Sequence, residues 1–299
     1  ARIYGGEKMS KGIDVSHHNG IIDWQKVKAD GIDFAIIRCG YGQLEDREFK
    51  KYTEGAIKAG IPVGIYYFSY ALNVQQAKDE AAHCIKLIKP YKIDLPVYFD
   101  FEYDSETFGQ KKGVTYTKAL RTDIHKAFCD AINAGGYKPG IYTNIDYITN
   151  RIDWNALKGC SLWLAQWPLG GNRNIKFEEV KETAVNTKYG KPDIWQIGKG
   201  RIGGINTDVD MNYGYIVLPD KSVPVQAKPT EPKLKKGDKV KVINTTQVLN
   251  LRRGKLYGGG TFVVYRDSYD VIQVNGDRVV IGVGNAVTAA VHIKDLKKV

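Results

Sequence analysis

Apolar and polar positions follow two patterns between about residue 11 and residue 216. Short apolar runs of strand length cover 12–16, 34–38, 61–69, 95–101, 140–143, 162–167 and 194–197. Apolar residues recur at helical spacing in three segments, 47–60, 75–89 and 115–134. The repeated strand-then-helix order predicts parallel strands with helices outside them. A closed (β/α) barrel is the arrangement that this order favours, with its chemistry at the carboxyl ends of the strands.

A different pattern follows. Residues 218–236 contain four prolines among polar residues and have no apolar period, so we expect an extended linker. Residues 237–299 alternate in short β-rich pieces with a turn at Asn275-Gly276, which predicts a small β-barrel. The predicted domains are therefore 10–217 and 237–299, joined by 218–236. We expect residues 1–8 to be foreign to the natural chain, because Met9 has the features of a natural start.

The two predicted domains differ in net charge. The formal net charge is +11, and residues 233–299 hold 13 Lys and Arg residues against 5 Asp residues. Most of the positive excess therefore belongs to the C-terminal segment, which suits a polyanionic partner such as nucleic acid or the anionic polymers of a bacterial wall. The longest apolar run, 61–72, is interrupted and too short to span a bilayer, so we expect no membrane insertion.

The pattern of cysteines indicates that the protein is made in a reducing compartment. Cys39, Cys84, Cys129 and Cys160 lie far apart in apolar patterns and form no C-x-x-C pair. We expect reduced core residues and no zinc site. Residues 1–8 lack the order of a secretory signal, so we expect synthesis in the cytosol without a signal peptide.

The strongest chemical signal is the run VYFDFE at residues 97–102. Side chains of a strand alternate between faces, so Asp100 and Glu102 point the same way with Cα atoms about 6–7 Å apart. Repulsion and partial burial raise the pKa of one acid and leave the other ionised, as protonation of a glycosidic oxygen requires. Asp14, at the end of the first strand, brings a third acid to the same barrel mouth.

Three weaker patterns leave alternatives open. His17-His18 favours a hydrogen-bonding or loop-structural role over metal binding, because no carboxylate follows at ligand spacing. The glycines at 258–260 favour a flexible turn over a phosphate loop, because no Lys-Ser/Thr pair follows. Five aromatic residues near strand ends suit either stacking on a sugar ring or packing, namely Tyr66, Tyr67, Tyr142, Trp167 and Trp195.

Several strings together resemble glycoside hydrolase family 25, the muramidases often called Chalaropsis-type lysozymes. They are GIDVSHHNG at 12–20 with IDW at 22–24, PVYFDFE at 96–102, WLAQW at 163–167, IWQ at 194–196 and VDMN at 209–212 after the last strand. The resemblance covers roughly residues 10–216. It implies hydrolysis of the β-1,4 bond between N-acetylmuramic acid and N-acetylglucosamine in peptidoglycan. It also implies an α/β fold, a flattened barrel of mixed β/α and β units. We expect no cofactor and no metal.

Roles carried over from the family fall on four acids. Glu102 matches the general acid, and Asp100 matches a partner that is either a nucleophile or the group that steadies a substrate N-acetyl group. Asp14 and Asp210 match two further acids of the cleft. The resemblance leaves the stereochemical course open between retaining, inverting and substrate-assisted. The predicted substrate-binding residues are Tyr66, Tyr67, Tyr142, Gln166, Trp167 and Trp195.

The C-terminal segment resembles the Src-homology-3-like wall-binding modules of phage and clostridial lysins. We expect its aromatic residues to contact wall peptide or sugar, in particular Tyr257, Phe262, Tyr265 and Tyr269. The sequence thus predicts a two-domain lysozyme, a phage endolysin or autolysin that acts on Gram-positive walls after release through a membrane lesion or lysis. Its expected partners are peptidoglycan and anionic wall polymers, not nucleic acid.

Three rival functions remain open. A catalytically silent peptidoglycan-binding protein would have little use for four acids, and a nucleic-acid-binding protein fits the charge but not the acidic cleft. A chitinase-like glycosidase also uses an Asp-x-Glu on a barrel strand. Its motif expects a further upstream aspartate, and this chain has Tyr98 at that position.

Overall fold

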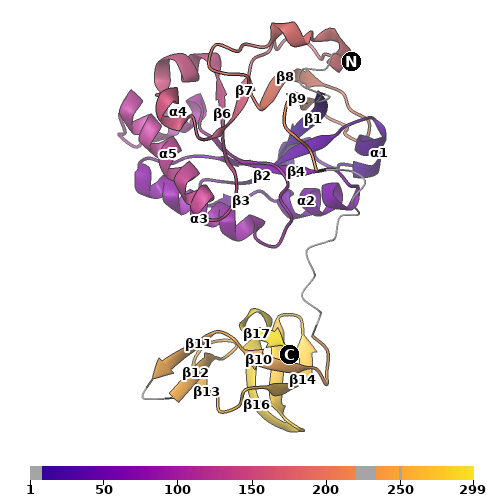
Figure 1. Ribbon diagram of the computed structural model, residues 1–299, viewed down its shortest axis with the longest axis vertical. Coiled ribbons are helices and arrows are strands. Elements are labelled where there is room, and N and C mark those ends of the chain that lie inside the picture. The colour runs from indigo at the N-terminus through magenta and orange to yellow at the C-terminus, as the bar shows by residue number, and fades with distance from the viewer. Residues whose placement is uncertain (1–8, 220–233, 249–250) are drawn as a thin grey trace. The chain divides into compact units, whose positions relative to one another are not determined.

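The computed structural model describes residues 9–219, 234–248 and 251–299. The chain divides into two compact units, residues 1–225 and 226–299 (Figure 1). The expectation about residues 1–8 and most of the predicted linker fall outside the described residues. The two units are considered separately below.

The first unit contains a closed barrel of eight strands, and its α-helices lie in the connections between β1 and β6 (Figure 1). Its strands are β1 (Ser10–Val15), β2 (Phe34–Tyr41), β4 (Val63–Phe68), β5 (Val97–Asp100), β6 (Pro139–Asn144), β7 (Ser161–Ala165), β8 (Ile194–Gly200) and β9 (Val209–Gly214). Neighbours in the barrel follow this order, and β1 pairs with both β2 and β9 to close it. The short β3 (Leu44–Glu45) extends β2 at its edge. The predicted barrel fold is confirmed.

Helices connect the strands on the outside of the barrel. They are α1 (Trp24–Ala29), α2 (Phe49–Lys58), α3 (Val74–Ile88), α4 (Tyr103–Gln110) and α5 (Lys118–Ala134). Shorter helical turns are η1 (His17–Asn19), η2 (Tyr147–Arg151), η3 (Trp154–Leu157), η4 (Phe177–Glu179) and η5 (Glu182–Ala184). Side-chain caps begin the two longest helices, since Asn73 accepts from the Gln76 amide and Thr117 from the Leu120 amide. In the described parts of the chain, helices lack the combined length and apolarity that crossing a bilayer requires.

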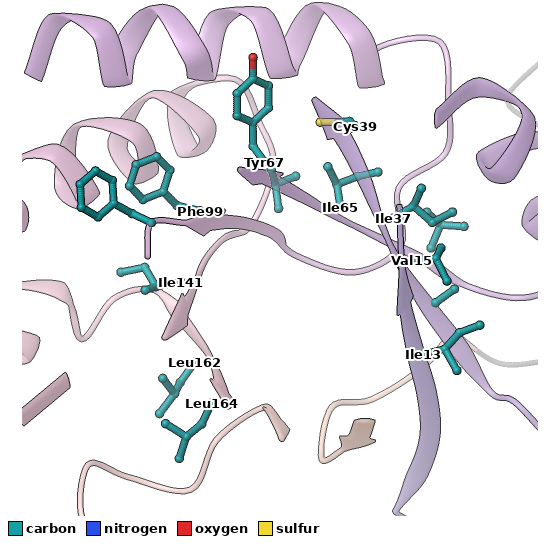
Figure 2. Close-up of a cluster of buried hydrophobic side chains, with 14 of the residues drawn as sticks. Ile13, Val15, Ile37, Cys39, Ile65, Tyr67, Phe99, Ile141, Leu162 and Leu164 are labelled. Carbon is teal, nitrogen blue, oxygen red and sulfur yellow. The ribbon is translucent and has the colours of Figure 1, made fainter. Parts of the chain in front are cut away.

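Side chains of the barrel strands alternate between two apolar clusters. The outer cluster packs the strands against the helices, and Figure 2 shows part of it, including Val15, Ile37, Ile65 and Phe99. The inner cluster fills the barrel with large side chains, namely Phe34, Ile36, Tyr66, Leu95, Tyr98, Trp163 and Ile194. This alternation decides which polar residues reach the interior, because every second residue of a strand shares a face.

One strand corrects the sequence prediction. Residues 209–212 do not follow the last strand; they belong to β9, which runs antiparallel to both β8 and β1. Residues 201–208, which join β8 to β9, can reverse the chain direction but are too short for the crossover that a parallel pair needs. The barrel is therefore mixed, as the family resemblance implies.

The second unit is built from strands in its described residues. They are β10 (Lys239–Val242), β11 (Thr245–Val248), β12 (Leu251–Lys255), β13 (Thr261–Val263), β14 (Tyr269–Asn275), β15 (Arg278–Val283), β16 (Ala286–His292) and β17 (Leu296–Lys298), with the 3-10 turn η6 (Ile293–Asp295). Five strands form one sheet in the order β16-β15-β14-β10-β17, and β11, β12 and β13 form another. The small all-β fold is confirmed, whereas the likeness to an SH3 domain stays a prediction.

A glycine on β6 tests the packing of the barrel interior. A Cβ atom at Gly140 would lie 2.4 Å from two ring carbons of Tyr98, whereas a Cβ at Gly159 would meet nothing within 4 Å. We expect Gly140→Ala to lower the free energy of unfolding by about 1–3 kcal/mol through overpacking. Urea denaturation measures the change, and Gly159→Ala serves as the matched control with little effect. Equal stability of the two variants would contradict this account of the interior.

Candidate active site

Three barrel strands bring aspartates to the same interior face at the barrel mouth. Asp14 on β1 and Asp210 on β9 are direct partners in the antiparallel register, so their side chains share a face. Asp100 is the last residue of β5, and Glu102 follows it at the amino end of α4. The negative charge of Asp14 raises the pKa of each of the other three acids, which indicates that all four lie close together. The four acids predicted from the sequence therefore converge.

Burial raises the pKa of all four acids, and repulsion by neighbouring carboxylates adds to the rise for Asp100, Glu102 and Asp210. Burial raises the pKa of Asp14 to about 6, although two side-chain amides oppose the shift. For Asp210, burial and the neighbouring Asp14 raise the pKa to about 8 against the influence of Lys199. Burial, Glu102 and Asp14 together raise the pKa of Asp100 well above its usual range. Burial also raises the pKa of Glu102, although a hydrogen bond with Asp100 opposes the shift.

Asp14 is held by two side-chain amides. Asn212 Nδ2 donates to Asp14 Oδ2 at 2.7 Å, and Gln196 Nε2 donates to the same oxygen at 3.1 Å. Trp163 Nε1 in turn donates to Asn212 Oδ1 at 2.8 Å, which fixes the orientation of the amide. Strands β1, β7, β8 and β9 are thus joined by one buried network of hydrogen bonds.

Three of the predicted substrate-binding aromatic residues contact residues of this network. Tyr142 Oη and Trp167 Nε1 both donate to Gln196 Oε1, each at 3.1 Å. Tyr66 belongs to the inner cluster, and its ring meets the ring of Trp163 edge-on at 5.9 Å. Tyr142 meets the same tryptophan at 4.6 Å. Tyr66, Tyr142 and Trp167 therefore lie beside the acids, as the sequence predicts.

The other three predicted substrate-binding residues have different surroundings. Tyr67 is fully buried on the outer face, and its hydroxyl donates to the Gly42 carbonyl at 2.7 Å. Trp195 is also buried there, and its Nε1 donates to the Gln166 carbonyl at 2.7 Å. The Gln166 side chain donates to the Ala184 carbonyl at 3.1 Å and so holds a loop. Contrary to the sequence expectation, Tyr67 and Trp195 point away from the mouth, because each is one residue out of step with the interior face.

A buried ion-pair cluster lies next to the mouth. Asp46 accepts from Arg38 Nε at 2.8 Å and contacts His17 Nδ1 at 2.8 Å. Burial opposes its ionisation, but hydrogen bonds from His17, Arg38 and the Glu48 amide hold the pKa of Asp46 below its usual value. The Arg38 charge also offsets part of the rise in the pKa of Asp100 that burial and the neighbouring acids cause. His17 therefore has a hydrogen-bonding role, and the described residues contain no group of three or more His, Cys, Asp or Glu side chains that could hold a metal ion.

A second ion-pair cluster holds α4, the helix whose N-cap residue is Glu102. Glu106, one turn into α4, donates its amide to the Glu102 carbonyl at 3.1 Å. Its buried carboxylate receives two hydrogen bonds from Arg121 of α5, at 2.7 and 2.6 Å, and one from Tyr147 of η2 at 2.6 Å. Bidentate pairing of this kind fixes geometry as well as charge. The start of α4, and with it Glu102, is thereby fastened to α5 and η2.

A buried carboxyl likewise fixes the backbone beside Asp100. Ser69 donates its hydroxyl to Glu80 Oε2 at 2.6 Å, and the Tyr70 amide donates to Glu80 Oε1 at 2.9 Å. The Ser69 amide donates to the Asp100 carbonyl at 2.8 Å. Burial raises the pKa of Glu80 to about 7 despite these hydrogen bonds. Glu80 on α3 therefore supports the end of β4 next to the acid-bearing strand.

Sequence reasoning missed the residues that organise the acids. Gln196 and Asn212 were within strings already singled out, and period-two alternation from Ile194 and Asp210 would have placed both on the interior face. Arg38 follows Phe34 and Ile36 on the same face of β2. Asp46 had no comparable signal, because it lies between β3 and α2 and its partners come from distant parts of the chain.

Comparisons with known proteins agree with this geometry. The chain is 24% identical over 209 residues to the autolytic lysozyme of Clostridium acetobutylicum, covering 68% of this chain and 60% of that protein. It is 28% identical over 211 residues to lysozyme M1 of Streptomyces globisporus, covering 68% and 66%. The chain thus spans less than two thirds of the length of either relative.

A solved structure has the same fold. The modular autolysin LytC from Streptococcus pneumoniae, determined in complex with a synthetic peptidoglycan ligand, superposes with a TM-score of 0.58 at 26% identity. The superposition covers 71% of this chain and 48% of LytC. The model of the family described as glycosyl hydrolases family 25 matches residues 13–203, which include Asp14, Asp100 and Glu102 and end before Asp210. Because the match spans more than half of its length, this chain belongs to glycosyl hydrolases family 25.

Proposed function

We propose that the barrel unit is an N-acetylmuramidase that cleaves the β-1,4 bond between N-acetylmuramic acid and N-acetylglucosamine in the peptidoglycan of Gram-positive walls. The observation that carries this proposal is the convergence of Asp14, Asp100, Glu102 and Asp210 on one barrel mouth. Family membership and the lysozymes among its relatives support the same substrate class. Action at the cell wall is part of the proposal, and release through a membrane lesion or lysis stays a prediction.

Glu102 is proposed as the general acid. It is half-buried, and its raised pKa favours the protonated form that a general acid needs. Asp104 and Asp14 contribute to that shift by repelling the ionised form. The Glu106 cluster positions the acid by fastening the first turn of α4.

Asp100 is proposed as the partner of the acid, either a nucleophile or the group that stabilises a substrate-assisted intermediate. Its Oδ1 is buried and has no hydrogen-bond partner among the described residues, so the chain leaves this acceptor unsatisfied. Burial, Glu102 and Asp14 raise its pKa, and the charge of Arg38 acts in the opposite direction by favouring the ionised form. Positive charge that develops on the sugar during bond cleavage would favour ionisation further, because opposite charges attract strongly in a partly dry site.

The second unit is proposed to bind the cell wall. Its excess of Lys and Arg suits anionic wall polymers, and the exposed Tyr257 and Tyr265 suit contacts with wall peptide or sugar. Two other aromatic residues expected there are less available. Phe262 is half-buried, and Tyr269 is buried with its hydroxyl accepting from the Tyr265 and Arg266 amides.

Replacement of the acid tests the mechanism. Glu102→Gln keeps the shape of the side chain but removes the proton, so we expect turnover of purified cell wall to fall by about 10²–10⁴-fold. The measurement is release of reducing ends, with mass spectrometry of the wild-type products to identify muramic acid at the new end. Glu54→Gln, an exposed change on α2, is the control and should leave turnover unchanged. A Glu102→Gln enzyme with more than about a tenth of wild-type activity would refute the role of this residue.

The pH profile tests the electrostatic coupling. Asp14 and Asp104 raise the pKa of Glu102, so Asp14→Asn and Asp104→Asn should each lower it. Glu102 then loses its proton at lower pH, and the alkaline limb of kcat/KM moves toward acid. Asp123→Asn, an exposed change on α5, should leave the limb in place. The coupling is absent if the limb of both neighbouring variants coincides with that of wild type.

Charge reversal tests the proposed wall binding. Lys255→Glu with Arg266→Glu changes two exposed residues of the second unit, and we expect binding of the full chain to purified wall to weaken by about tenfold. Lys78→Glu with Lys86→Glu makes the same change in net charge on α3 and should have little effect. Co-sedimentation with wall measures both double variants. Equal weakening of the two would assign binding to net charge instead of to the second unit.

A further inference from the structure

Two cysteines meet at the end of the barrel opposite the acids. Cys129 on α5 places its sulfur 3.7 Å from the carbonyl oxygen of Gly140, near the start of β6. Gly140 pairs in register with Ser161, the residue that follows Cys160. Cys129 and Cys160 therefore both lie where β6 and β7 begin, and their side chains interact. Asp100 pairs with Tyr142 further along β6.

The pair opens onto a cavity. Cys129 and Cys160 both line a hollow of about 300 Å³, together with Lys126, Asp130 and Gly159. Cys160 also lines a neighbouring hollow of about 500 Å³. Cys160 is partly exposed, and Cys129 is 3% exposed. A small molecule that enters from solvent would therefore meet Cys160 before Cys129.

The two thiols differ in acidity. The more exposed Cys160, which a reagent would meet first, is the more acidic of the two. A hydrogen bond with Cys129 lowers the pKa of Cys160, and the same bond and burial raise the pKa of Cys129. The thiolate is the nucleophile in exchange with disulfides, and a low pKa with exposure marks a reactive cysteine. Cys160 has both properties.

The other two cysteines form a matched but sealed pair. Cys39 on β2 and Cys84 on α3 have sulfurs 3.5 Å apart, and both side chains are fully buried. Cys39 lies in the apolar layer between barrel and helices (Figure 2). Burial also raises the pKa of Cys39 well above its usual value. This pair has the same chemistry without a route for a reagent.

We propose that Cys160 and Cys129 form a thiol–disulfide exchange site for low-molecular-weight disulfides. The Cys160 thiolate attacks one sulfur of the reagent, which forms a mixed disulfide and expels one reagent thiolate. Cys129 then gives its proton to solvent and attacks the Cys160 sulfur, which releases the second reagent thiol. Two protein thiols are oxidised to one disulfide, and one reagent disulfide is reduced to two thiols. The product cross-links α5 to the start of β7 without touching the acids.

The test exposes the native full chain to 2-hydroxyethyl disulfide and follows intact mass and cysteine-containing peptides. We expect the wild type to lose two hydrogens and gain a Cys129–Cys160 linkage, with reaction at Cys160 at least about tenfold faster than at Cys39 or Cys84. Cys129→Ser should stop at a mixed disulfide on Cys160. Cys160→Ser should stay unmodified while folded, with all three remaining thiols reacting after denaturation.

Three results would overturn the proposal. They are a wild-type chain that does not react, a wild-type chain that stops at the mixed disulfide, and reaction of the sealed pair as fast as that of Cys160. Thermal unfolding and wall turnover of both serine variants establish that they fold. Because the exchange site is distant from the acids, we expect turnover by both variants to equal that of the wild type.

Discussion

Repulsion among four carboxyl groups is the constraint that shapes the barrel mouth. Ionising all of several closely spaced buried acids costs a large free energy. Each acid must therefore stay protonated, accept hydrogen bonds or lie near a positive charge. The chain uses all three means. Gln196 and Asn212 donate to Asp14, the charge of Arg38 acts on Asp100, and the pKa of Asp210 is raised to about 8, which favours its protonated form. The polar residues around the acids follow from that one problem.

The fold was predictable because its signals are local and repeated. Strand and helix periods predicted the order of the elements, and the carboxyl ends of the strands predicted where Asp14 and Asp100 would meet. The direction of β9 was not predictable from its own pattern, since a buried strand reads the same in either direction. Only the short connection from β8, residues 201–208, carried that information.

The sequence predicted which acids would line the site more successfully than which aromatic residues would. A position one residue out of step changes the face of a strand, so Tyr66 lies beside the acids and Tyr67 packs against helices. The same step separates Gln196 from Trp195. Strand ends alone did not resolve this choice, because the exact register depends on bulges such as the one between Gln196 and Gly198. Partners from separate segments, as in the Arg38–Asp46 pair, depend on tertiary packing that no local pattern contains.

Closure of the barrel by β9 also determines when the four acids come together during synthesis of the chain. Asp14 and its donor Asn212 are separated by 198 positions in the chain, and Asp210 lies next to that donor. A ribosome makes β1 first and β9 last among the barrel strands, and distant pairing carries the largest entropy cost. A partly synthesised barrel therefore lacks both a closed interior and its fourth carboxylate. The four-acid site is therefore complete only when β9, the final barrel strand, pairs with β1.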